Sequence, residues 1–442
     1  MPRVFASARV RSASVISYPR RVVLHARIGK REVMKNPFGI WDRRTFFSGS
    51  GMTLIAASFR PRYLRAAQLA AEHGEVYRQL GLRPLINAAG TYTVLTGSVM
   101  PERARRAMEA ASRSFVHLED LQKAVGERIA RITGAESAMV TSGAACSIML
   151  ATAASVTGTD TEKIRRVPDL TGLKNEVIVP RAHRNGFDHA ARNVGVRLIE
   201  VETLDELRRA IGPKTAMLYF TNIFEHKGPI KRAEFIAAGK QSGVPVFNDA
   251  AAELPPATNL SSIVHEGFDL VGFSGGKGLR GPQSSGLLLG RRDLIHAALL
   301  NSNPHDDAIG RPCKVGKEEI LGLLAAVEEY MQRDHEADIR LWRGFMESIA
   351  RDLRGLDTVT AEVYTPGAGG HPVPYLRVQW NQSRLRLKYA DCARQLRDGE
   401  PAIEVNAADD GLTIASYNLY PGEERIIGYR LRGILRETET GS

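Results

Sequence analysis

Short apolar runs alternate with helix-like stretches along the chain from about residue 75. The apolar runs have the length and composition of strands, and they lie at 137–141, 176–180, 196–201, 216–221, 244–248, 270–274 and 286–290. Between and before them, the pattern predicts helices at 98–114, 118–133, 144–156, 204–211 and 232–242. Apolar strands that alternate with helices are typical of a mostly parallel sheet with helices on both faces.

The pattern changes after about residue 300. A long helical stretch at 317–353 comes first, and a mixture of short strands and helices follows over 359–435. We therefore predict an α/β protein in three parts: an N-terminal extension at 1–74, a large α/β domain at 75–310, and a linking long helix with a small α+β domain at 311–442. A chain of 442 residues is long enough for two such domains.

The charge of the chain is concentrated near its N-terminus. The net charge is +11, but residues 1–65 carry 14 Lys and Arg against two acidic residues, and the remaining 377 residues have a net charge of −1. These 377 residues, which we call the body of the protein, are therefore not basic in the way that a nucleic-acid-binding protein is. The three cysteines form no CxxC pair, and no apolar run reaches the length of a membrane span.

Two interpretations of the extension remain open. Arg43 and Arg44 precede a weakly apolar run that ends near Phe59, and the segment 34–60 resembles a twin-arginine export signal. A disordered basic arm explains the same composition. The cytoplasm is the default location, with export to the periplasm as the alternative.

Two strand ends carry the residues of a pyridoxal-phosphate site. Asp249 ends the run Phe247-Asn248-Asp249, and Lys277 lies in the glycine-rich loop 275–281 after the strand at 270–274. An acid keeps the pyridine nitrogen of the cofactor protonated, and a lysine forms the Schiff base and moves the Cα proton. The loop is not a P-loop, because Val271 and Gly278 stand where that motif needs Gly and Ser or Thr. A solvated lysine beside a strand-terminal acid is the simpler alternative.

Two further segments favour the cofactor site. Ser142, Gly143 and Ala144 join a strand to the start of a helix, where free N–H groups suit a phosphate, and Ser274 adds a hydroxyl. His183 follows another strand and offers an imidazole that can stack on a ring. Its six-residue separation from His189 is poor for shared metal ligation, so we expect no metal site.

These segments resemble a known family. The stretches INAAGTYTVLTGS (86–98), TSGAACS (141–147), LTGLKNEVIVPRAHRNGFDHA (170–190), FNDAAAELPP (247–256) and FSGGKGLRGPQSSGLLLG (273–290) look like the selenocysteine-synthase-like group of fold-type I pyridoxal-phosphate enzymes. The group includes seryl-tRNA selenium transferase and D-glucosaminate-6-phosphate ammonia-lyase. The resemblance covers about residues 77–429, and the lysine loop is its most specific part.

The resemblance implies roles for individual residues. Lys277 matches the Schiff-base lysine, Asp249 the pyridinium partner, and His183 the ring-stacking residue, and these three are the catalytic candidates. The implied phosphate contacts are Ser142, Gly143, Ala144 and Ser274. The segment 221–228 falls near the cofactor's 3-hydroxyl and the substrate, and from it we choose Asn222 for the cofactor and His226 for the substrate.

The neutral body favours a small-molecule branch of the family over a tRNA-using one. We expect a lyase that removes the Cα proton from a small amino acid or amino sugar acid and eliminates a β-substituent, releasing ammonia and a 2-keto acid. A seryl-tRNA selenium transferase and other pyridoxal-phosphate reactions (aminotransferase, racemase or aldolase) remain alternatives. Arg377 is the candidate for the substrate carboxylate, although a paired strand arginine explains it equally well.

The resemblance also implies a homodimer or higher homo-oligomer, because such enzymes complete each active site with residues from a neighbouring subunit. The glycine-bearing segment 87–93 suits a loop that reaches into a site, and Thr91 is its candidate substrate contact. A plain lead-in to the first helix is the alternative for this segment.

Overall fold

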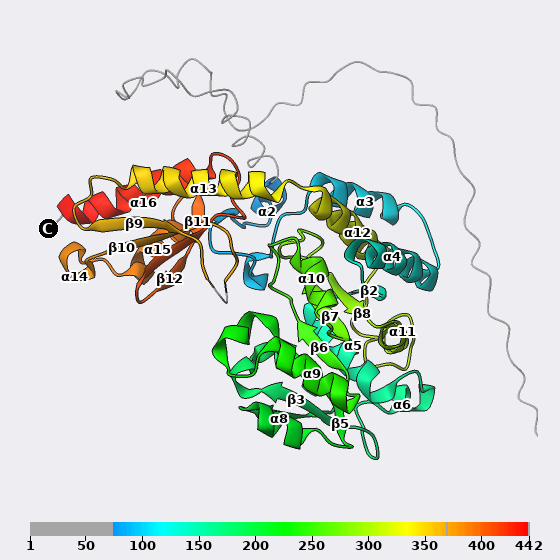
Figure 1. The fold of residues 1–442 in the computed structure, drawn as a ribbon. Coiled ribbons are helices and arrows are strands. Elements are labelled where there is room, and N and C mark those ends of the chain that lie inside the picture. Colours follow the sequence, from blue (N-terminus) through cyan, green and yellow to red (C-terminus); the bar gives the residue numbers. More distant parts are fainter. Residues whose placement is uncertain (1–73, 368–369, 441–442) are drawn as a thin grey trace, which may run out of the picture. The chain divides into compact units, whose positions relative to one another are not determined.

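The computed structural model of the chain describes residues 74–367 and 370–440 (Figure 1). The twin-arginine segment at 34–60 and nearly all of the extension predicted at 1–74 lie outside the described residues, so those two expectations stay predictions. The described chain combines a seven-stranded sheet covered by helices with a smaller antiparallel sheet near the C-terminus.

The large sheet is mostly parallel, as the sequence predicts. The order of its strands is β2 (Ser137–Thr141), β8 (Gly286–Gly290), β7 (Leu270–Ser274), β6 (Val246–Asp249), β5 (Thr215–Thr221), β3 (Glu176–Pro180) and β4 (Arg197–Val201). Only β8 runs antiparallel to its neighbours β2 and β7 among these strands. The strands β5, β6 and β8 are buried along their whole length, which explains their continuous apolar sequence.

Helices cover both faces of this sheet. Successive residues of one strand enter opposite cores: Leu287 and Leu289 of β8 pack into one cluster, and Leu288 packs into another. The first face is covered mainly by α4 (Leu118–Thr133), α9 (Arg232–Ser242), α10 (Asn259–His265) and α12 (Lys317–Gln332). The second is covered mainly by α5 (Ala144–Thr157) and α11 (Arg292–Leu300). The remaining helices of this part include α3 (Glu102–Ser112), α6 (Thr161–Arg166), α7 (His189–Arg192) and α8 (Leu204–Ala210).

The C-terminal part has its own core around a four-stranded antiparallel sheet. Its strand order is β12 (Asn406–Ala408), β13 (Gly411–Ala415), β10 (Tyr375–Trp380) and β9 (Val359–Tyr364). The helices α13 (His335–Asp352), α15 (Tyr389–Asp398) and α16 (Glu423–Thr440) pack with it. The early strand β1 (Leu85–Asn87) pairs with β11 (Ala402–Glu404), and Ile86 is buried in this second core.

The single long helix expected at 317–353 is wrong, because the structure has two helices there. α12 ends at Gln332, Arg333 is extended with ψ 144°, and α13 begins after Asp334. The Asp334 carboxylate accepts a hydrogen bond from the backbone N–H of Ala337 at 2.9 Å, which is an N-cap. The break matters for the site, because it turns Arg333 and His335 toward the loop that holds Lys277.

Candidate functional site

The candidate residues gather at one edge of the large sheet. Asp249 ends β6 and Ser274 ends β7, and the register pairs Asp249 with Thr221 at the end of β5 and with Gly272 of β7. Carboxyl ends of adjacent parallel strands form the edge at which open α/β sheets bind ligands. The topology therefore brings together segments that are separated by tens of residues in the sequence.

Asp249 and Lys277 interact electrostatically at this edge. Asp249 is 7% exposed, and its carboxylate accepts hydrogen bonds from the Tyr219 hydroxyl at 3.2 Å and from the backbone N–H of Ala251 at 3.1 Å. Burial raises the pKa of Asp249, while the positive charge of Lys277 opposes that rise. Burial lowers the pKa of Lys277, and the charges of Asp249 and Glu253 oppose that change. The two groups are electrostatically coupled, as a lysine and an acid at one cofactor would be.

The turn at Ser142–Ala144 lies beside Ser274. Ser274 pairs with Gly286 in the β7–β8 ladder, and Gly286 pairs with Thr141, the residue before the turn. A Cβ on Gly286 would lie 2.6 Å from the carbonyl carbon of Gly143 and 2.9 Å from the backbone nitrogen of Ala144, so only glycine allows this approach. Gly143 has φ +98° and open space where a Cβ would stand, directly before the N-terminus of α5. The sheet thus presents free N–H groups and two serine hydroxyls in one place.

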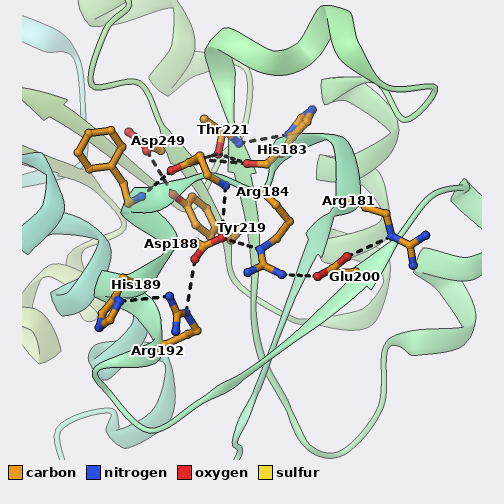
Figure 2. Close-up of polar contacts among 12 residues, drawn as sticks. Arg181, His183, Arg184, Asp188, His189, Arg192, Glu200, Tyr219, Thr221 and Asp249 are labelled. Atoms are coloured by element: carbon orange, nitrogen blue, oxygen red, sulfur yellow. Dashed lines mark hydrogen bonds and ion pairs between the residues drawn. The ribbon is translucent and has the colours of Figure 1, made fainter.

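His183 is held in the 3-10 turn η3 (Arg181–His183) at the end of β3. Its ring is 1% exposed and packs edge-on against Phe220, with 4.4 Å between ring centroids. Nδ1 accepts a hydrogen bond from the backbone N–H of Thr221 at 3.3 Å, and Nε2 has no partner among the described residues (Figure 2). Burial lowers the pKa of His183 to about 4, so the imidazole is neutral at physiological pH.

An ion-pair network anchors the segment that carries His183. Figure 2 shows Asp188 between Arg184 and Arg192, and Arg184 and Arg181 both reaching Glu200 of β4. Asp188 is 1% exposed, and its carboxylate lies 3.5 Å from Nε of Arg192. A buried acid with two arginine partners holds the loop in one conformation, and this loop fixes the position of the imidazole.

Asn222 and His226 lie in the 3-10 helix η5 (Asn222–Lys227) after β5. Asn222 is buried, and its side-chain oxygen accepts hydrogen bonds from Asn248 at 3.0 Å and Arg232 at 3.3 Å. His226 is exposed at the rim of a cavity of about 420 Å³, which Asn222, Glu253 and His371 also line. The structure therefore places both candidates beside the same cavity.

Thr91 and Arg377 have different surroundings. Thr91 lines a small cavity together with Lys277 of the same chain. Arg377 lies on β10, opposite Glu362 of β9, with its guanidinium 4.8 Å from the centre of the Tyr364 ring. It lines neither this cavity nor the larger one. The structure thus brings Thr91 to Lys277 and does not bring Arg377 there.

Three further residues at this edge were not among the sequence-based candidates. Tyr219 lies two residues before Thr221 on the same strand and bonds to Asp249. Glu253 and His371 are both electrostatically coupled to Lys277. Glu253 lies in the stretch 247–256, four residues after Asp249. Its closeness to Asp249 in the sequence could have marked it as a candidate. His371 comes from the distant C-terminal part, and no local pattern indicates it.

Comparison with protein families and known proteins gives a consistent result. The family model described as L-seryl-tRNA selenium transferase matches residues 85–343. D-glucosaminate-6-phosphate ammonia lyase of Salmonella typhimurium is 32% identical over 376 residues, which cover 81% of this chain and 97% of that protein. A 5'-C-glycyluridine monooxygenase-decarboxylase of a Streptomyces species is 36% identical over 75% of this chain and 84% of that protein. The L-seryl-tRNA(Sec) selenium transferase of Moorella thermoacetica is 27% identical over 80% of this chain and 83% of that protein.

Solved structures agree with the fold. The structure of D-glucosaminate-6-phosphate ammonia-lyase matches with a TM-score of 0.73 and 30% identity, over 82% of this chain and 98% of that one. Serine palmitoyltransferase with a bound pyridoxal-phosphate–myriocin adduct matches with a TM-score of 0.51 at 12% identity, which is a likeness of fold alone. The expected fold-type I architecture is confirmed.

Proposed function

The chain belongs to the L-seryl-tRNA selenium transferase family of pyridoxal-phosphate-dependent enzymes, and on that basis we propose that it is a lyase. Its substrate in this proposal is an amino acid or amino sugar acid, from which it removes the Cα proton and releases ammonia and a 2-keto acid. The observation that carries the proposal is that Lys277, Asp249 and the turn at 142–144 lie at one edge of the sheet.

The residues at this edge fit the cofactor. Gly143 leaves open space where a Cβ would stand, directly before the N-terminus of α5. Ser142, Gly143, Ala144 and Ser274 would hold the phosphate there. His183, whose Nε2 is buried without a partner, would lie on the ring face. Asp249 would face the ring nitrogen, Asn222 the 3-hydroxyl side, and Lys277 would hold the cofactor covalently.

The chemistry that the chain itself supplies centres on Nζ of Lys277. When bound, the cofactor supplies an electron sink for the pair left on Cα. Burial favours the neutral form of Lys277, and a neutral amine can accept the Cα proton. The Tyr219 hydroxyl donates to Oδ2 of Asp249 and orients the carboxylate toward the site. His183, whose pKa burial lowers to about 4, stays neutral, so it would lie against the cofactor ring rather than carry a proton.

The larger cavity favours an amino sugar acid over a small amino acid as the substrate. Its volume of about 420 Å³ exceeds what the side chain of a small amino acid occupies, and it lies beside Asn222 and Glu253. His226, Lys231 and His371 line it together with acidic groups. Mixed donors and acceptors suit the hydroxyl groups of a sugar chain. We propose that His226 contacts this part of the substrate.

A second candidate function follows from the 36% identity to the monooxygenase-decarboxylase. In this alternative the same residues deprotonate or decarboxylate at Cα in an oxygen-consuming reaction. The selenium transferase alternative is weaker, because residues 66–442 carry no net positive charge with which to hold tRNA phosphates.

The test is an assay of the purified holoenzyme with D-glucosaminate, D-glucosaminate 6-phosphate, and D- and L-serine. We expect ammonia and a 2-keto acid in equal amounts from a sugar acid, with no oxygen consumed. Lys277→Ala should abolish turnover, and borohydride reduction of the wild type should fix the cofactor at Lys277. Oxygen uptake without keto-acid release would favour the second candidate, and labelling of another lysine would refute the assignment of Lys277.

We also propose an oligomeric state and a cellular location for the protein. We propose that the protein is a homodimer or a higher homo-oligomer and that it binds a small-molecule substrate. No helix among the described residues is long and apolar enough to cross a bilayer. We propose the cytoplasm as the location, with twin-arginine export as the alternative. A fusion of residues 1–65 to a reporter that is active only after export separates the two.

A further inference from the structure

A small cavity beside Lys277 contains polar groups that lack partners. Its volume is about 20 Å³, which is room for roughly one or two water molecules. Besides Lys277, its walls include Arg280 of the lysine loop, Tyr330 of α12 and Asn418, which follows β13. Three separate elements of the fold thus contribute a hydrogen-bond donor to one small space.

Arg280 is a partly buried cation that has no acidic side chain within ion-pair distance among the described residues. Its guanidinium donates to the backbone carbonyl of Tyr417 at 2.5 Å, and it forms no ion pair with any of the described residues. Burial and the neighbouring charge of Arg333 lower the pKa of Arg280. Arg333 is itself bonded to Asp338 at 2.9 Å. The charges of Asp338 and Glu329 favour the charged form of Arg280 but form no ion pair with it. A partly buried charge without an ion-pair partner is costly, and an anion in the cavity would reduce that cost.

The backbone of Arg280 is in an unusual conformation. Its φ is +56°, one of only three positive values at non-glycine positions among the described residues. The left-handed region is unfavourable for a bulky residue, and residues held there cluster at ligand sites. A glycine would relieve this strain, so the presence of arginine indicates that its side chain is needed here.

Tyr330 and Asn418 are the second, independent sign of a ligand. The Tyr330 hydroxyl and Nδ2 of Asn418 are buried and have no hydrogen-bond partner among the described residues. Tyr330 is 6% exposed, and burial raises its pKa, so it remains a donor. Buried polar groups are rarely left unpaired in folded proteins. Asp338 also lines the cavity, and its carboxylate is paired with Arg333. Two donors without partners in the cavity that also holds Arg280 therefore indicate an acceptor with several lone pairs.

We propose that this cavity binds the α-carboxylate of the substrate, with Arg280, Tyr330 and Asn418 as its donors. The proposal rests on the proposed function, because the carboxylate is attached to the Cα whose proton Lys277 moves. The α-carboxylate lies one bond from that carbon, so a cavity that Lys277 also lines is within its reach. A carboxylate is planar and can accept two parallel hydrogen bonds from a guanidinium group, and it is small enough for this cavity. This assignment replaces Arg377 in the role expected from the sequence.

Binding of a non-reacting analogue tests the site without any turnover. D-Gluconate has the carboxylate and the hydroxyl chain but no amino group, sorbitol lacks the carboxylate, and sorbitol 6-phosphate carries a phosphate instead. Isothermal titration calorimetry on the cofactor-loaded protein measures their affinities. We expect Arg280→Met to weaken gluconate binding at least tenfold and to leave both sorbitol compounds unaffected. Arg343→Met, at an exposed position of α13, is the matched control.

Tyr330→Phe separates a ligand contact from a structural role. It removes one unpaired hydroxyl, so Tm should stay equal or rise while gluconate binding weakens several-fold. This variant also tests the proposal if Arg280→Met does not fold. Unchanged gluconate affinity in Arg280→Met or Tyr330→Phe overturns the proposal, as does a wild type that binds no gluconate. Loss of affinity in Arg377→Met alone returns the role to Arg377.

The two proposals fail in different ways. If sorbitol 6-phosphate is the ligand that depends on Arg280, the cavity takes a phosphate and the carboxylate assignment is wrong. If gluconate depends on Arg280 while no sugar acid releases ammonia, the carboxylate site stands and the proposed reaction is wrong.

Discussion

Asp249 is a buried carboxylate whose proposed role depends on its negative charge. Asp249→Asn keeps the shape and the acceptor for the Tyr219 hydroxyl but removes the ionic partner of the ring nitrogen. A hydrogen bond to a charged group contributes about 1.5–3 kcal/mol, so we expect kcat to fall at least roughly tenfold. Steady-state kinetics on the folded, cofactor-loaded variant would measure the fall in kcat. Undiminished turnover would refute the role, and Tyr219→Phe should give a smaller loss.

The same residue gives a pH-dependent effect on stability in protein stripped of cofactor. Burial raises the pKa of Asp249 in the folded state. A raised carboxyl pKa stabilises the fold below the unfolded-state pKa, and this contribution is lost as the pH rises through the folded-state value. Asn cannot ionise, so the Tm of Asp249→Asn should rise relative to the wild type as the pH increases above the ordinary carboxyl pKa of about 4. A Tm difference that does not change with pH would contradict this.

Cys313 is expected to be the most reactive of the three thiols. Its pKa is lowered because the thiol of Cys146 and the hydroxyl of Ser142 donate hydrogen bonds to it, and it is partly exposed. The pKa of Cys392 is raised by burial to about 12. Iodoacetamide should therefore modify Cys313 first, as peptide mapping would show. Cys313→Ser should remove the fast phase, and fast labelling of Cys392 would contradict the assignment.

At the scale of elements, the β8 strand sets the shape of the phosphate turn. Gly286→Ala places a Cβ within 2.6 Å of the Gly143 backbone, and overpacking of this kind costs typically 1–3 kcal/mol. Because the turn at 142–144 must move, we expect weaker cofactor binding, measured by spectroscopic titration of cofactor-free protein. Gly344→Ala in α13, where a Cβ meets nothing within 4 Å, is the control. It should slightly raise Tm, because alanine favours a helix by about 0.5–1 kcal/mol. Equal cofactor affinity in both variants would disprove the role of Gly286.

At the scale of the whole molecule, we expect residues 1–65 to be dispensable for assembly and catalysis. They carry a net charge of +12 and little sustained apolar periodicity, so they offer few contacts for packing. A chain that begins at residue 66 should keep its oligomeric state, cofactor content and turnover, measured by light scattering, absorbance and the ammonia assay. A monomeric or cofactor-free product would mean that the extension is part of the fold.

The local pattern determined the elements that carry the proposed chemistry. Apolar runs that end in Asp249 and Ser274 became β6 and β7, and the Ser-Gly turn became the start of α5. These are local features, because strand burial on both faces and helix capping depend on neighbouring residues. The parallel order of the strands followed from their alternation with helices, so the meeting of Asp249 with Lys277 could be predicted.

The small cavity beside Lys277 could be found only in the tertiary structure. Arg280, Tyr330 and Asn418 lie far apart in the chain, and none of them looks unusual in its own segment. They became candidates because folding left the donors of Tyr330 and Asn418 buried without partners and placed the guanidinium of Arg280 beside them. Arg377 looked suitable in sequence, but the register of β9 and β10 placed it beside Glu362 and Tyr364. A sequence pattern records periodicity along the chain, whereas hydrogen-bond satisfaction between distant segments exists only once they are packed together.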